Sequence, residues 1–206
     1  MKTASKKMRI ILFLLKINLV TSCSAQTLQE QLVNALNASS LQNITYTENQ
    51  LNRVKIVYPT NINESFNPVL LDSISNDSNI ENLCSGGSYL IKYEVKALSP
   101  NFVSILKIKA SNFCDFYDDI EYQTLNLFLA NDNKVYSIIL NNSAQLKNTI
   151  NNFIFQDPGC NSPSNTLNTL LLFTDKKLKL FIVKDKVCNE LIDYTMNNDL
   201  LSFNTY

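Results

Sequence analysis

The sequence predicts an exported single domain of the α+β class, an antiparallel sheet of hairpins with one or two helices packed on one face and two disulfides. Three observations support this fold. Apolar and polar residues alternate over several short segments, helical spacing is confined to two segments, and four cysteines lie far downstream of a basic, apolar N-terminus. Alternation is typical of half-buried strands, whereas apolar residues three and four apart indicate a helix. Hydrophobic residues make up 45% of the chain, which is typical of a globular protein.

The first predicted element is a helix over about residues 28–38. Thr27 and Glu30 form a capping-box pattern, in which a hydroxyl caps the helix and a glutamate three residues later reaches back. Leu28, Leu32 and Leu36 then recur at helical spacing.

Two short strands are predicted next, at 44–47 and 53–58, where apolar and polar residues alternate. Residues 59–87 hold prolines, glycines and many Asn and Ser residues. We expect this stretch to be mostly loop, with one helical turn that starts at Pro68.

Three hairpins follow, each made of two alternating segments around a polar turn. They pair 88–95 with 103–108, 122–130 with 135–140, and 167–174 with 178–184. Between the second and third hairpins, Leu146, Ile150, Phe153 and Ile154 predict a helix capped by Ser143. A last strand near 190–196 and a helical turn at 198–203 complete the domain.

The positions of four cysteines predict how they pair. Cys84 and Cys114 fall almost opposite each other when the first hairpin is extended, and Cys160 and Cys188 do the same around the third. We therefore predict the disulfides Cys84–Cys114 and Cys160–Cys188. Each closes a loop of roughly 30 residues and is expected to stabilise the fold by about 3 kcal/mol.

Residues 1–22 are predicted to be a signal peptide, and residues 23–206 the exported domain. Four positive residues precede the apolar segments 10–15 and 17–20, which are too short and interrupted to span a membrane. Removing residues 1–22 takes away five positive charges and leaves a net charge of −5. This acidic balance disfavours nucleic acid as a partner.

The run Val20-Thr21-Ser22-Cys23 resembles the bacterial lipobox. The resemblance implies cleavage before Cys23, attachment of lipid to its sulfur, and a membrane contact through that lipid. Ser24 in the next position implies the outer membrane rather than the inner one. Ordinary signal cleavage after Ala25, which would release a periplasmic or secreted protein, is the alternative.

The chain contains no histidine. This excludes Ser-His-Asp and Cys-His nucleophilic catalysis and the common zinc enzymes. No cysteine sits in a C-x₂-C pair, and export favours disulfides over thiolate ligands. We predict no metal, no cofactor and no enzymatic activity.

An acidic and aromatic segment between the first two hairpins is the predicted partner-binding site. Its residues are Phe113, Asp115, Phe116, Tyr117, Asp118 and Asp119. Aromatic side chains rimmed by carboxylates are typical of a protein-binding hot spot. A solvated acidic loop is the simpler interpretation, and a hydrolase that uses Asp115, Asp118, Asp119 and Glu121 is a third hypothesis.

Five lysines cluster around the third hairpin: Lys176, Lys177, Lys179, Lys184 and Lys186. They suggest a site for an anionic glycan or lipid. Alternatively, they protect an edge strand from pairing with another sheet.

Residues 89–203 resemble the extracytoplasmic β-rich domain of lysozyme-sensing anti-sigma factors. The likeness lies in the order of a Tyr-rich hairpin, a strand pair, a helix, a hairpin containing 173–178, and a terminal strand with a short helix. It implies a fold and no activity. The expected function is a non-enzymatic envelope lipoprotein that binds another protein, as a periplasmic inhibitor or an immunity protein against a secreted toxin or lytic enzyme. A glycan- or lipid-binding sensor is the alternative.

Overall fold

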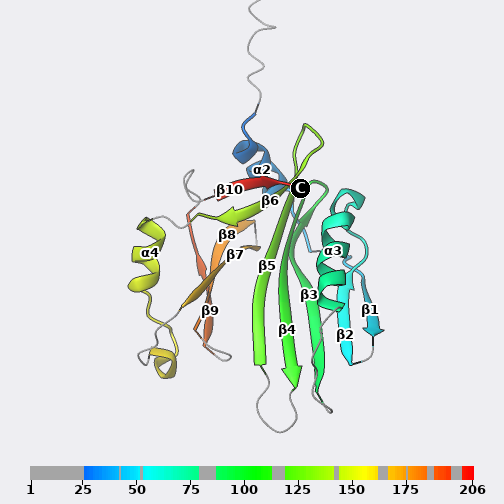
Figure 1. Ribbon diagram of the computed structural model, residues 1–206. Helices are drawn as coiled ribbons and strands as arrows, with labels where there is room; N and C mark the ends of the chain where they lie inside the picture. The colour runs from blue at the N-terminus through cyan, green and yellow to red at the C-terminus, as the bar shows by residue number, and fades with distance from the viewer. Residues whose placement is uncertain are drawn as a thin grey trace, which may run out of the picture.

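The protein is described from a computed structural model. The described residues are 26–41, 43–51, 53–78, 87–112, 119–141, 144–161, 167–174, 176–184, 188–195 and 201–206. They form an α+β fold with two sheets (Figure 1), which confirms the predicted class. The expectation of one sheet is wrong, because the third hairpin forms a sheet of its own.

The larger sheet has seven strands. In spatial order they are β1 (Tyr46–Leu51), β2 (Val54–Pro59), β3 (Ser88–Ser99), β4 (Phe102–Asn112), β5 (Asp119–Leu129), β6 (Val135–Leu140) and β10 (Leu201–Thr205). Neighbouring strands are antiparallel except β2 and β3, which are parallel. The smaller sheet has the order β7 (Asn168–Thr174), β8 (Lys177–Val183) and β9 (Asn189–Asp193). The three predicted hairpins are therefore confirmed.

A helix longer than the sequence predicts lies between the two parallel strands. A short 3₁₀ turn (Glu64–Phe66) leads into α3 (Asn67–Ser78), where only one helical turn was expected. Parallel neighbours need a long crossover connection, and α3 provides it. Its apolar residues Val69, Leu70 and Ile74 are buried on the sheet, so tertiary packing rather than local propensity stabilises this helix.

The C-terminal segment also differs from its prediction. Residues 201–203, which were expected in a helical turn, belong to strand β10, which pairs with β6. Leu201 is buried and Phe203 packs against the core, with polar residues between and after them. This alternation is a strand pattern, and the open edge of β6 supplies the partner that makes the strand favourable.

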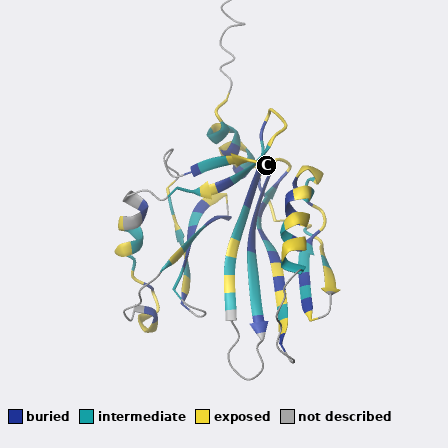
Figure 2. Ribbon diagram, viewed as in Figure 1, coloured by how far each residue is buried: buried dark blue, intermediate teal, exposed yellow. Residues whose placement is uncertain are grey.

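The two faces of the larger sheet border two separate cores, and a β-bulge in β3 changes which core the side chains of this strand enter. The register shifts between Val95 and Ala97, so Val95 faces the same side as Ile105 and α3, whereas Ala97 faces the opposite side. Without the extra residue, both side chains would share one face. Figure 2 shows the middle strands largely buried or intermediate, with β1 mostly exposed and α3 exposed on its outer side.

The second sheet and the N-terminal helix cover the face opposite α3. Helix α2 (Leu28–Asn37) begins at the predicted capping box, with both Thr27–Glu30 hydrogen bonds present. Its buried residues Leu32 and Leu36 share a core with β7 and β8. Helices α2 and α3 therefore pack on opposite faces, which corrects the expectation that the helices share one face.

The helix between the second and third hairpins is shorter than predicted. Helix α4 spans Ala144–Asn151, so Phe153 and Ile154 lie beyond its end. Leu146 is buried as expected, and Phe153 still packs against Phe155 edge to face. Ile154 is 75% exposed and contributes nothing to the core.

One predicted disulfide is present in the described part of the chain. Cys160 and Cys188 are bonded across the base of the third hairpin, with 5.5 Å between their Cα atoms. Both residues are buried and belong to the core shared with α2. Cys23, Cys84 and Cys114 lie outside the described residues, so the Cys84–Cys114 bridge stays a prediction.

Two buried polar side chains join the sheets. The Ser104 hydroxyl donates to Asn126 Oδ1 (2.6 Å), and Asn126 Nδ2 donates to the carbonyl oxygen of Leu171 on β7 (3.0 Å). The backbone N–H of Phe173 donates to Ser104 Oγ (3.1 Å). Strand β7 is an edge of its own sheet, so these side chains satisfy backbone groups that would otherwise be buried without partners.

We predict that Asn126→Leu lowers the free energy of unfolding by about 2–4 kcal/mol, because it leaves a buried carbonyl and a buried hydroxyl without their partner. Urea denaturation measures the change. The matched control is Asn204→Leu on β10, an exposed site expected to shift stability by less than about 0.5 kcal/mol. Equal effects of the two substitutions would contradict the role assigned to Asn126.

Candidate functional site

The predicted partner-binding segment lies mostly outside the described residues. This holds for Phe113, Asp115, Phe116, Tyr117 and Asp118, whereas Asp119 is the first residue of β5, with its side chain outside the described part. The structure does place the strand ends that carry the segment. Strand β4 ends at Asn112 and β5 begins at Asp119, at the end of the sheet farthest from α2 (Figure 1).

An apolar row crosses the sheet at this end. Leu90, Ala110 and Ile120 are register partners on β3, β4 and β5. Their neighbour Ile91 faces the α3 core, so the row lies on the opposite face. Leu90 is 44% exposed, and the other two are half-buried. The row therefore forms a small accessible apolar strip beside the predicted binding segment.

The other face at this end is charged and aromatic. Lys109 Nζ lies 3.6 Å from Glu121 Oε2 and 5.0 Å from the centre of the Tyr89 ring. Glu121, one of the carboxylates considered for catalysis, is therefore paired with a lysine across the strands.

The basic hairpin is partly neutralised by its own sheet. Asp193 on β9 lies 3.1 Å from Lys177 Nζ and 3.4 Å from Lys179 Nζ. Hydrogen bonds from Lys177 and Lys179 hold the pKa of Asp193 below its ordinary value. Lys184 Nζ donates to the carbonyl oxygen of Cys160.

Lys177 and Lys179 do not protect an edge. They lie on β8, the middle strand of the smaller sheet, so the edge-protection interpretation is wrong for them. Lys176 precedes this strand in a left-handed conformation (φ 62°), and Lys186 lies outside the described residues. With two of the lysines paired to Asp193, the hairpin has less free positive charge than the sequence suggests.

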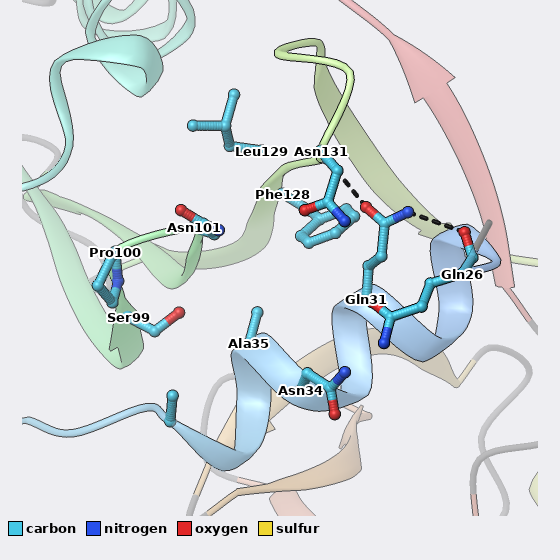
Figure 3. A pocket seen from close by; sticks show the side chains of 11 residues that line it. Gln26, Gln31, Asn34, Ala35, Ser99, Pro100, Asn101, Phe128, Leu129 and Asn131 are labelled. Atoms are coloured by element: carbon cyan, nitrogen blue, oxygen red, sulfur yellow. Dashed lines mark hydrogen bonds between the residues drawn. The ribbon is translucent and has the colours of Figure 1, made fainter. Parts of the chain in front are cut away.

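A cleft of about 270 Å³ lies between α2 and two turns of the larger sheet (Figure 3). One wall is α2, and the other comes from the turn between β3 and β4 and from the end of β5 with its following turn. None of the lining residues is charged. Five carry carboxamides: Gln26, Gln31, Asn34, Asn101 and Asn131.

Gln31 connects the two walls of this cleft. Its Oε1 accepts from the backbone N–H of Asn131 (2.9 Å), and its Nε2 donates to the carbonyl oxygen of Gln26 (2.9 Å). Gln31 and Asn131 are one hundred positions apart in the chain. Gln31 therefore holds α2 at a defined distance from the turn after β5.

Ser99 is an unusual member of the cleft wall. It is 6% exposed, and its buried hydroxyl oxygen has no hydrogen-bond partner among the described residues. Figure 3 shows the hydroxyl on the side of the residue that faces α2. A buried hydroxyl without a partner is unfavourable and rare in folded proteins.

Sequence reasoning predicted the turns that contain Ser99 and Asn131 but not the cleft. Helix α2 lies far from both turns along the chain, and no spacing in the sequence signals that they meet. Carboxamides are also common throughout this chain, so five of them near one another carry no local pattern.

A polar cluster clamps α3 onto the sheet. Asp77 near the end of α3 accepts from Lys107 Nζ (2.7 Å) and from the Tyr93 hydroxyl (2.5 Å), and Ser73 lies 3.0 Å from that hydroxyl. Tyr93 is fully buried, and the side chains of Asp77 and Lys107 are each 12% exposed. The cluster offers no access to a substrate, so we assign it to stability. Sequence reasoning missed it because Asp77 falls in the stretch expected to be loop.

Burial, followed by the hydrogen bond to Asp77, raises the pKa of Tyr93 well above its ordinary value, although the Ser73 hydrogen bond acts in the opposite direction. The folded protein therefore holds this proton more tightly than the unfolded chain. The stabilisation is complete below the pKa of a free tyrosine, about 10, and is lost as the pH rises beyond it.

Within the described ranges, no group of three or more His, Cys, Asp or Glu side chains is placed to hold a metal ion. No described helix is both long and apolar enough to cross a membrane. Comparisons with family models, curated proteins and solved structures find no match for this chain.

We predict that the free energy of unfolding falls between about pH 10 and pH 11 and that Tyr93→Phe removes part of this decrease. Urea denaturation at several pH values measures it. Tyr206→Phe, at a residue 67% exposed, is the matched control and should keep the wild-type pH dependence. An unchanged decrease in the Tyr93 variant would show that another group causes it.

Proposed function

We propose that the chain is an exported cell-envelope lipoprotein that binds another protein and catalyses no reaction. The partner contacts the end of the larger sheet where β4 and β5 meet the segment from Phe113 to Asp119. A periplasmic inhibitor, or an immunity protein against a secreted toxin or lytic enzyme, would act in this way.

The disulfide supports export. Cys160 and Cys188 are 7% and 6% exposed, and the bridge is part of the main core. Structural disulfides persist in oxidising compartments and are rare where thiols are kept reduced. A buried bridge that closes a separation of 28 residues is expected to stabilise the fold by about 3 kcal/mol.

The lysine-paired carboxylates Glu94 and Asp193 are poorly suited to act as general acids near neutral pH. Burial alone would raise the pKa of Glu94, but hydrogen bonds and charge from Lys96 and Lys92 outweigh it, and the net shift is downward. The pKa of Asp193 is also lowered, by Lys177 and Lys179. A general acid that works near neutral pH needs a shift in the other direction.

The main support for the proposal is that the apolar row of Leu90, Ala110 and Ile120 lies at the end of the sheet away from Cys23. Cys23 lies three residues before Gln26, so a lipid on Cys23 would be at most about 10 Å of extended chain from the described start of the domain. The Asn112 and Asp119 strand ends lie at the opposite end of the sheet (Figure 1). A protein anchored at Cys23 would present Leu90, Ala110, Ile120 and the adjoining acidic, aromatic segment away from the membrane.

The proposal predicts a cross-link at one end of the sheet only. A photoreactive phenylalanine analogue at position 117 should join the protein to a partner in intact cells, and the substitution Leu90→Arg should abolish that product, because a charge replaces the exposed side chain of the apolar row. The readout is the cross-linked band on a gel, identified by mass spectrometry.

The matched control is Leu71→Arg on α3, where the leucine is 56% exposed on the other side of the sheet. This variant should keep the cross-link. No product at position 117, or equal loss in both variants, would rule out partner binding at this end of the sheet.

A second prediction concerns the anchor. Cys23→Ser should move the protein from the membrane fraction to the soluble fraction without changing its thermal unfolding, because the capping box of α2 and the Cys160–Cys188 bridge do not involve Cys23. Fractionation and a non-reducing gel measure both effects. A variant that stays in the membrane, or loses the disulfide, contradicts the separate role assigned to Cys23.

A further inference from the structure

We infer that the cleft between α2 and the two turns binds an uncharged, polyhydroxylated ligand the size of one sugar ring. The inference goes beyond the proposed function: it concerns the opposite end of the molecule and does not depend on a protein partner. Three observations support it: the lining is uncharged, three exposed carboxamides make no hydrogen bond to another described residue, and the buried Ser99 hydroxyl has no partner among the described residues.

The carboxamides at the rim are available to a ligand. The side chains of Asn34, Asn101 and Asn131 are exposed and make no hydrogen bond to another described residue, whereas Gln31 is occupied in holding the walls together. Each carboxamide presents two N–H donors and an acceptor oxygen. Three such groups lining one small cleft suit a ligand whose groups also donate and accept, as sugar hydroxyls do.

Ser99 adds a buried polar contact. The Ser99 side chain can rotate about its Cα–Cβ bond between staggered positions without breaking a hydrogen bond to any described residue. A ligand hydroxyl that reaches it satisfies a group that is otherwise buried without a partner. An apolar ligand would leave Ser99 unsatisfied and would also take water away from the rim carboxamides.

The residues that line the cleft favour a neutral ligand, and the volume of the cleft limits its size. No charged side chain lines the cleft, so a charged ligand would lose hydration without gaining a counter-charge. Ala35, Leu129 and the ring of Pro100 supply apolar surface for the C–H face of a sugar. The volume of 270 Å³ equals that of about nine water molecules at ~30 Å³ each, and it lies just below the usual range of drug-sized pockets.

The test is a titration of the purified full chain with D-glucose, D-galactose, D-mannose, N-acetyl-D-glucosamine and myo-inositol, followed by NMR. At least one of them should produce saturable shifts in the side-chain amide signals of Asn34, Asn101 and Asn131. Affinity in the millimolar range is expected for a small, open site of this kind. Glycine, acetate and a neutral tripeptide serve as probes of the competing ligand classes.

Two variants tie the binding to the cleft. Ser99→Ala should weaken the affinity roughly three- to tenfold, as expected for one neutral hydrogen bond. The ligand-free variant should stay at least as stable, because that hydroxyl has no partner in the described part of the chain. Asn34→Ala should weaken it similarly. Asn37→Ala is the matched control, since Asn37 is exposed on the same helix but does not line the cleft, and it should bind as the wild type does.

Saturable shifts that both cleft variants weaken and Asn37→Ala does not would establish the site. Shifts that never saturate with any of the five sugars and polyols would overturn it. Tighter binding of the tripeptide or of a charged probe would overturn the ligand class. None of these outcomes bears on the cross-link at position 117, so the two proposals succeed or fail separately.

Discussion

The arrangement of the two sheets depends on the hydrogen bonds that join the side chains of Ser104 and Asn126 to the backbone of β7. Strand β7 presents a free edge, and this edge is buried against the larger sheet rather than exposed to water. Buried backbone groups need partners, so the smaller sheet docks where these two side chains can supply them. The same position brings Phe173 against Phe102 and Phe181 against Tyr122, each edge to face.

The bulge in β3 is the second constraint, because it decides which residues meet α2. The register shift after Val95 turns Ala97 and Ser99 toward the α2 side, while Tyr93 stays under α3 with Asp77 and Lys107. Because of this one extra residue, β3 contributes Tyr93 to the polar cluster under α3 and Ser99 to the cleft on the α2 side. Both features follow from the alternation of side chains along a single strand.

The two proposed binding features lie at opposite ends of the larger sheet and differ in chemistry. The row of Leu90, Ala110 and Ile120 is apolar and adjoins an acidic, aromatic segment, which suits a protein surface. The cleft beside α2 is small, uncharged and rich in carboxamides, which suits a neutral ligand. In the proposed lipoprotein, the cleft lies at the end near the anchored Cys23 and the apolar row at the end away from it.

The sequence by itself determined the features that depend on neighbours along the chain. The capping box at Thr27, the three hairpins and the Cys160–Cys188 pairing were all predicted, because turn residues and alternation act over short separations. Tertiary structure decided the division into two sheets, the length of α3, the pairing of the Leu201 strand with β6 and the cleft at Ser99. These arise from burial and hydrogen bonds between segments up to a hundred residues apart, and no local pattern encodes such contacts.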